Sequence, residues 1–155
     1  MKAIVQRVSS ASVEVDGKVI GEIALGLVVL AAVEESDTES ECRWMAEKLV
    51  NLRIFPDEAG KMNRSLLDVG GSMLLISNFT VAGECSKGRR PSFDRAMKPP
   101  RAKEEFDHLL TAVRALGIPV ETGEFGADMR VRIVNEGPVT LIVSTEPRSA
   151  PVVAP

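Results

Sequence analysis

The stretch Asn135-Glu136-Gly137-Pro138-Val139-Thr140 lies between two apolar runs, residues 129–134 and 139–143. Branched aliphatic residues alternate with others in both runs, which is the pattern of strands. Glycine lets the backbone turn sharply, and proline fixes φ, lacks an N–H and is the residue before which a cis peptide costs least. This pair can therefore present two carbonyl oxygens with no side chain in the way. The alternative is an ordinary hairpin turn, which the pair alone favours.

Toward the N-terminus, the sequence predicts three more strands. Residues 3–15 alternate apolar and polar side chains, with a bend expected near Ser9-Ser10. Asp16-Gly17 is a hairpin signal, so residues 18–23 are predicted to pair back. The unbroken apolar run 27–33 predicts a strand that is buried on both faces.

Two helices are predicted between and after these strands. The first ends near Leu52, and a capping box begins it, formed either by Ser36 with Glu39 or by Thr38 with Glu41. The second follows two prolines and ends at Gly117 and Pro119, with a short strand predicted after it over residues 118–124. Each helix has one apolar face, which predicts packing against a sheet.

The strand predicted over residues 72–76 leads directly into Ser77-Asn78-Phe79-Thr80. Small hydroxyls and an amide at the end of a buried strand are well placed to form a polar site on a rigid support. The alternative is that these side chains only bond to neighbouring backbone groups, and this segment alone favours that interpretation.

Residues 86–103 are strongly basic although the whole chain carries a net charge of −3. They hold seven lysine or arginine residues and one acid, Asp94. A solvated loop and a loop that contacts phosphates are about equally supported. The candidate phosphate contacts are Lys87, Arg89, Arg90 and Lys98.

Composition limits the class of protein. The 155 residues suffice for one domain, and 45% hydrophobic residues allow a core that is mainly aliphatic, because only 4% are aromatic. Cys42 and Cys85 lack metal-binding spacing and predict reduced thiols of a cytoplasmic protein. The first apolar run is broken at Gln6 and Arg7, so it is not a signal peptide, and no run is long enough to span a membrane.

The sequence lacks the usual parts of a hydrolase. It has a single histidine, His108, on the polar side of the second helix, and neither a Gly-x-Ser-x-Gly elbow nor a Cys–His pairing. Neither a phosphate-binding glycine loop nor a metal cluster is present, so no cofactor and no metal are predicted. If the protein is an enzyme, main-chain groups and the substrate itself must supply much of the chemistry.

Six segments, in order and spacing, resemble the D-aminoacyl-tRNA deacylases, or D-tyrosyl-tRNA deacylase family. The segments are Gln6-Arg7-Val8 with Ala11-Ser12-Val13, Arg53-Ile54-Phe55 with Gly60-Lys61-Met62-Asn63, Ser77-Asn78-Phe79-Thr80, Arg90-Pro91-Ser92-Phe93, Ala127-Asp128-Met129, and Asn135 to Thr140. They cover residues 1 to about 144. The family usually has Gln where this chain has Asn78, which is one methylene shorter. Residues 146–155, rich in Pro and Ala, lie outside the resemblance and are predicted to be a loose tail.

The resemblance implies an α+β fold over residues 1–145. Layered β-sheets, largely antiparallel or mixed and barrel-like, would pack with two main α-helices, and the protein would be a homodimer. The implied reaction is hydrolysis of the ester that joins a D-amino acid to tRNA, or glycine mischarged on tRNA-Ala. The implied partner is the 3′ end of tRNA, with no membrane involved.

The resemblance also implies roles for residues. Ser77, Asn78, Phe79 and Thr80 would be catalytic, with main-chain N–H groups around Phe79 and Thr80 holding the negative charge that develops on the ester. Thr80 is the only hydroxyl to consider as a nucleophile, and the 2′-hydroxyl of the tRNA is the better candidate for assisting attack.

The implied substrate-binding residues are four. Gly137 and Pro138, joined by a cis peptide, would reach across the dimer and hold the ammonium of the amino acid. Arg7 would brace them, and Met129 would line the adenine pocket. Two alternatives stay open: a dimeric RNA-end binder without turnover, and an editing relative with an altered chirality preference.

Overall fold

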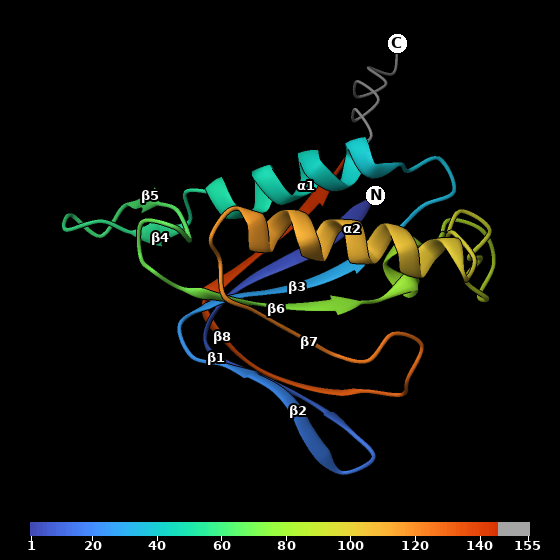
Figure 1. The fold of residues 1–155 in the computed structure, drawn as a ribbon, viewed down its shortest axis with the longest axis horizontal. Coiled ribbons are helices and arrows are strands. Elements are labelled where there is room, and N and C mark those ends of the chain that lie inside the picture. The colour runs from blue at the N-terminus through green and yellow to red at the C-terminus, as the bar shows by residue number, and fades with distance from the viewer. Residues whose placement is uncertain (146–155) are drawn as a thin grey trace.

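The computed structural model describes residues 1–145, so the predicted tail 146–155 lies outside the described residues. A six-stranded sheet and two helices make up most of the fold (Figure 1). The sheet contains β1 (Lys2–Val15), β2 (Lys18–Ile23), β3 (Gly26–Ala32), β6 (Ser72–Ser77), β7 (Val120–Thr122) and β8 (Arg130–Ser144). A separate two-stranded ladder, β4 (Phe55–Pro56) with β5 (Met62–Arg64), projects from one end of the molecule.

Strand β1 organises the sheet. Its first half pairs antiparallel with β3 and its second half with β2, while β8 runs antiparallel along both halves. The register of its pairing with β8 shifts on either side of Val8, close to Ser9-Ser10, where a bend is predicted. Asp16 and Gly17 have positive φ angles of 49° and 77°, which a two-residue hairpin turn requires. Because β2 also lies against β6 and β7, the sheet is nearly closed into a barrel.

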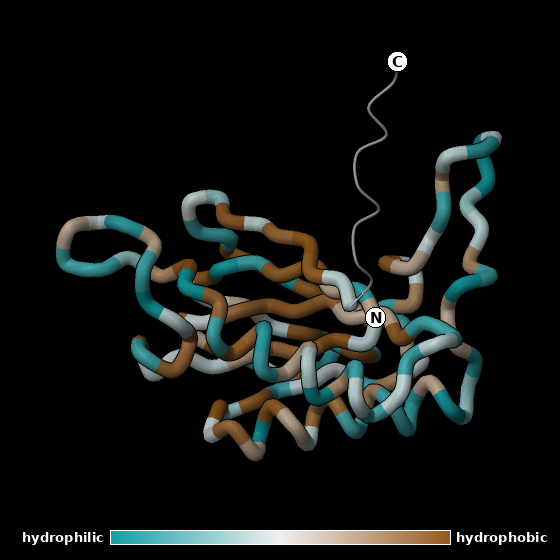
Figure 2. Tube along the Cα trace, turned by 90° about the horizontal axis from the view of Figure 1, so that it is seen from above, coloured by the Kyte–Doolittle hydropathy of each residue, from teal (hydrophilic) through white to brown (hydrophobic). Residues whose placement is uncertain are grey.

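Helices α1 (Glu39–Asn51) and α2 (Arg101–Ala115) cover one face of the sheet (Figure 1). Each connects two parallel strands, β3 to β6 and β6 to β7. Side chains of β3 alternate between two cores: Leu27 and Val29 pack under the helices, and Val28 packs inside the barrel. The prediction that this strand is buried on both faces is therefore confirmed, and Figure 2 shows that the apolar residues gather in the strands.

Helix α1 begins with the second of the two predicted capping boxes. Thr38 accepts from the Ser40 N–H, and Glu41 accepts from the Thr38 N–H at 2.9 Å. The alternative with Ser36 and Glu39 is wrong, because Glu39 is already the first residue of the helix.

The hairpin interpretation of residues 135–140 is wrong. Residues 130–135 pair with β1 from Glu14 to Val8, and residues 140–144 continue along β1 from Gln6 to Lys2. Both runs therefore point the same way within one strand, β8. Arg7 alone faces the four residues 136–139, which we call the β8 bulge. Periodicity could not reveal this, because the direction of the second run is set by its pairing with β1.

Candidate active site

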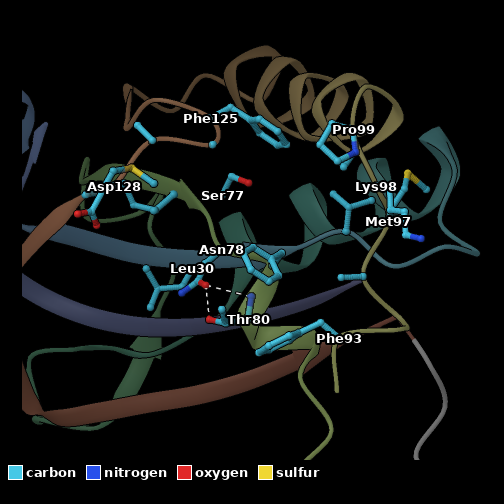
Figure 3. A pocket seen from close by; sticks show the side chains of 18 of the residues that line it. Leu30, Ser77, Asn78, Thr80, Phe93, Met97, Lys98, Pro99, Phe125 and Asp128 are labelled. Atoms are coloured by element: carbon cyan, nitrogen blue, oxygen red, sulfur yellow. Dashed lines mark hydrogen bonds between the residues drawn. The ribbon is translucent and has the colours of Figure 1, made fainter. Parts of the chain in front are cut away.

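A cavity of about 710 Å³ opens at the carboxyl end of β6 (Figure 3). Its wall comes from four parts of the chain: Leu30 with Val33, residues 76–80 at the end of β6, Phe93 with residues 96–99 and Ala102, and residues 125–129 with Val131. The volume lies within the range of about 300–1,000 Å³ that is typical of small-ligand sites. Segments that are distant in sequence therefore meet at one concave surface.

A short turn that begins at the last residue of β6 and spans residues 77–82, which we call the capped turn, contributes polar groups to this wall. It contains the 3-10 helix η1 (Phe79–Ala82), with Asn78 as its N-cap. Asn78 Oδ1 accepts from the Thr80 N–H at 3.2 Å and from the Thr80 hydroxyl at 2.5 Å (Figure 3). The Asn78 N–H donates to the Ala31 carbonyl at 2.8 Å, which ties this capped turn to β3.

These bonds determine what Thr80 can do. Its single hydroxyl proton is donated to an amide oxygen, which is not a base at neutral pH. The Thr80 N–H is also occupied by Asn78. Phe79, the first residue of η1, has no acceptor for its N–H within the helix, and no hydrogen bond elsewhere in residues 1–145 uses that N–H. The main-chain donor left available on this turn is therefore that of Phe79.

The structure brings some of the predicted site residues together and leaves others apart. Six of them line the cavity: Ser77, Asn78, Phe79, Thr80, Lys98 and Met129. Two other predicted groups do not line it, namely Arg7 with Gly137 and Pro138, and Lys87 with Arg89 and Arg90. Within one chain, the site predicted from sequence is thus divided among three places.

The β8 bulge is exposed and lies outside this cavity. Gly137 has φ of +118°, a region that favours glycine, and the peptide bond before Pro138 is cis. A Cβ on Gly137 would lie 2.9 Å from Val139 Cγ2 and 3.2 Å from Arg7 Nη2. The guanidinium of Arg7 therefore lies against the bulge, and its Nη1 donates to the Ile54 carbonyl at 2.6 Å.

Side chains on both sides of the bulge also hold it. Asn135 Oδ1 accepts from the Val139 N–H at 3.3 Å, and Asn135 Nδ2 donates to Thr140 Oγ1 at 2.8 Å. Gln6 on β1 donates to the same hydroxyl at 3.2 Å. The bulge is thus restrained at its base while Gly137 and Pro138 stay accessible.

The basic residues Lys87, Arg89 and Arg90 lie on an exposed loop, residues 84–92, which we call the basic loop. Glu84 and Ser92 pinch its base by exchanging two main-chain hydrogen bonds of 2.8 and 3.0 Å. Figures 1 and 2 show that the loop projects away from the helices and the sheet. Its charges are therefore free to meet another molecule.

Sequence reasoning missed Phe93, Phe125 and Leu30 as parts of the cavity wall (Figure 3). The rings of Phe93 and Phe79 meet edge to face, with centroids 5.2 Å apart and an interplanar angle of 76°. The ring centroids of Phe125 and of Phe106 on α2 lie 6.3 Å apart. The only signal for Phe93 was its place in the segment Arg90-Pro91-Ser92-Phe93, and that segment did not give it a role.

Neither cysteine lines this cavity, nor does the histidine, whereas the carboxylate side chain of Asp128 does (Figure 3). Burial raises the pKa of the Cys42 thiol to about 12, so this residue is not a thiolate nucleophile. His108 is on the exposed side of α2, 3.1 Å from Glu105. Residues 1–145 contain no group of three His, Cys, Asp or Glu placed to hold a metal ion. Over the same residues, the helices are too short or too polar to cross a membrane.

The family model and the curated relatives that match this chain agree on one family. The model of the family described as D-Tyr-tRNA(Tyr) deacylase matches residues 4–144. The chain is 57% identical to a D-aminoacyl-tRNA deacylase of Pelobacter propionicus, over 92% of this chain and 99% of that protein. It is 54% identical to the D-aminoacyl-tRNA deacylase of Geobacter sulfurreducens, over 97% of this chain and 99% of that protein.

Two solved structures are similar in fold. One, titled c-Myc DNA Unwinding Element Binding Protein, is 39% identical with a TM-score of 0.89, over 95% of this chain and 100% of that one. The other is titled as a probable eukaryotic D-amino acid tRNA deacylase. Its TM-score is 0.78, over 92% of this chain and 97% of that one. At 18% identity, the second likeness concerns the fold alone.

Proposed function

The chain belongs to the D-Tyr-tRNA(Tyr) deacylase family, and from this we infer that it hydrolyses D-aminoacyl-tRNA in the cavity at the end of β6. The bond broken is the ester between the amino acid and the terminal adenosine. Glycine mischarged on tRNA-Ala is a second substrate in this proposal. The observation that carries the site assignment is the capped turn, where an available main-chain N–H and small polar groups line a cavity of suitable size.

The proposed chemistry uses water rather than an enzyme nucleophile. Water adds to the ester carbonyl carbon, the bond to the ribose oxygen breaks, and that oxygen takes a proton as it leaves. The negative charge on the carbonyl oxygen is stabilised by the Phe79 N–H. Since the Thr80 hydroxyl donates to Asn78, no base activates it, and the neighbouring 2′-hydroxyl of the tRNA assists the attack instead.

Chirality is selected by the β8 bulge of a second copy of the chain. The carbonyls of Gly137 and Pro138 hold the ammonium of the amino acid in the partner's cavity. Their exposure, and their position outside the cavity of their own chain, support action across a dimer. With ammonium and ester both fixed, a D side chain points to solvent. An L side chain instead meets packed atoms, and this overlap destabilises the bound substrate by about 1–3 kcal/mol or more. Glycine has no side chain and passes.

The tRNA itself is held by charge in this proposal. Lys98 lies on the cavity wall, while Lys87, Arg89 and Arg90 lie on the projecting basic loop. This arrangement suits a 3′ end that enters the cavity and an acceptor stem whose phosphates meet the loop.

The test is deacylation of D-Tyr-tRNA, L-Tyr-tRNA and Gly-tRNA in parallel, with enzyme far below substrate concentration. We expect multiple turnovers on the D and glycyl esters and almost none on the L ester. Binding without turnover would instead indicate an RNA-end binding module. Rapid loss of L-tyrosine would indicate an editing enzyme of altered chirality, and a strictly monomeric active protein would refute action across a dimer.

A further inference from the structure

We propose that Phe93 is a positioning residue that couples the basic loop to the capped turn. Its ring transmits the placement of the loop to Phe79, so that binding of phosphates by the loop raises kcat and not only affinity. This inference rests on the function proposed above. It assigns a role in the reaction to a ring of the cavity wall that acts through Phe79.

The first observation is the ring contact itself. Phe79 is 57% exposed, which leaves its side chain few neighbours. Phe93 is half-buried and meets it edge to face at 5.2 Å. Such pairs have a preferred geometry. Phe93 is therefore well placed to set the orientation of the residue whose N–H is the candidate oxyanion donor.

The second observation is the close packing at Gly83, where the capped turn runs into the basic loop. A Cβ at Gly83 would lie 2.9 Å from Cε1 of Phe93 and 2.9 Å from the Thr80 carbonyl oxygen. The Gly83 N–H also donates to that oxygen, at 3.0 Å. The ring, the turn and the start of the loop are thus in direct contact, with no room for a side chain between them.

The third observation is that the chain after Phe93 is anchored to the body of the protein. The Phe93 carbonyl accepts from Ala96 at 3.0 Å, and the Met97 N–H donates to Val33 at 2.9 Å. Ala96 packs with Ala32 and Ala82 in a small core of its own. The base of the loop is thus held against the body of the protein next to the Phe93 ring, and in this proposal a phosphate bound by the loop acts on the ring through Ser92, the last residue of the loop.

The experiment compares two substrates of the wild-type protein and the Phe93→Ala variant. One is D-Tyr-tRNA, and the other is the D-tyrosyl ester of adenosine, which fits the same cavity but has no phosphates. We expect Phe93→Ala to lower kcat on the tRNA about three- to ten-fold more than on the adenosine ester. The variant Phe93→Tyr keeps the ring and should restore most of the difference.

A mutant cycle isolates the coupling. In the wild-type background, Arg89→Ala with Arg90→Ala should raise KM and lower kcat on D-Tyr-tRNA. In the Phe93→Ala background, the same pair should raise KM only. Phe125→Ala is the matched control, since this ring lines the same cavity but contacts Phe106 on α2. It should lower kcat on both substrates by the same factor.

The inference would be overturned if Phe93→Ala lowered kcat by the same factor on the two substrates. It would also be overturned if Arg89→Ala with Arg90→Ala lowered kcat on D-Tyr-tRNA as much in the Phe93→Ala background as in the wild-type background. If Phe93→Ala melts below the assay temperature, Phe93→Leu, which keeps apolar volume without the ring, is judged by the same two criteria. A wild-type protein that hydrolyses neither substrate would instead refute the proposed function. An active wild type with equal reductions in the variant refutes only the role of Phe93.

Discussion

The capped turn and the β8 bulge are both irregular segments held by an asparagine side chain, but they have different surroundings. The turn is fixed locally, because Asn78 bonds to Thr80 two residues on, and it lines the cavity of its own chain. The bulge is held at its base by Asn135, and the guanidinium of Arg7 on β1 lies against it; its tip is exposed, outside that cavity. The turn is part of a cavity wall of its own chain, whereas the bulge projects outside that cavity, beside a smaller pocket that Arg7 and Glu136 help to line.

This difference matches the division of labour that we propose. A turn that holds developing charge must be preorganised where the ester sits, and local capping achieves this. A group that rejects the wrong chirality must resist displacement, and a bulge braced by a guanidinium is suited to that. Changes at the turn, at the bulge and at groups that serve neither should therefore differ in both size and kind.

The largest effect is expected from the substrate rather than from the turn. Replacing the terminal adenosine by its 2′-deoxy form in a 3′-linked D-Tyr-tRNA should slow hydrolysis by about 10²–10⁴-fold, the range for removal of proton-transfer assistance. Thr80→Ala should keep appreciable activity on the normal substrate, because its hydroxyl is engaged with Asn78. Single-turnover rates measure both.

A trapped acyl-enzyme on Thr80 would contradict this view of the turn. It would also be contradicted if Thr80→Ala hydrolysed the normal substrate more slowly than the wild-type protein hydrolyses the 2′-deoxy substrate. A melting curve of Thr80→Ala controls for unfolding, since that variant cannot form the hydroxyl's hydrogen bond to Asn78.

The next largest effect is expected at the bulge. Gly137→Ala places a Cβ 2.9 Å from Val139 and 3.2 Å from Arg7, at a φ of +118°. The bulge must shift, and a displacement of about 1 Å can cost about 10²-fold in rate. We expect kcat/KM to fall by about that factor on D-Tyr-tRNA and Gly-tRNA alike.

Gly60→Ala is the control for backbone strain. Gly60 also has a positive φ, of +75°, but nothing lies within 4 Å of an added Cβ. This variant should lose some stability, about 1 kcal/mol, and keep its activity. Full activity of Gly137→Ala would show that the bulge does not select the substrate.

The sequence predicted the regular parts of both regions better than their irregular parts. The polar site at the end of β6 could be predicted because an apolar strand runs directly into polar residues, and this pattern is contained in one short segment of sequence. The brace of Arg7 on Gly137 depends on a register in which one residue of β1 faces four of β8, and no local pattern encodes that. The contact between Phe79 and Phe93 joins a turn to an irregular segment, where periodicity gives no signal.

A smaller effect is expected from the basic residues, which belong to neither region. The triple variant Arg89→Ala, Arg90→Ala, Lys98→Ala should raise KM about ten-fold for every aminoacyl-tRNA tested. It should also reduce the salt dependence, by roughly 0.7–0.9 of a log–log slope unit for each phosphate that is no longer neutralised. Titration of KM against salt measures this, and an unchanged slope would mean that the loop is merely solvated.

The smallest effect concerns His108, which lies on α2 beside neither the turn nor the bulge. The Glu105 carboxylate that accepts its hydrogen bond raises the pKa of His108 above the ordinary value of 6.5. Because the folded state favours the protonated form, this contribution to stability is fully present below about pH 6.5 and is lost as the pH rises through the raised pKa. The pair is exposed, so His108→Gln should remove no more than about 0.5 kcal/mol from the free energy of urea unfolding at pH 6, and almost none at pH 9.

The pH profile of deacylation should be the same in His108→Gln as in the wild type. A shifted profile would place a functional proton donor on the helix layer, and the chemistry could then no longer be assigned to the main chain of the turn and the substrate alone.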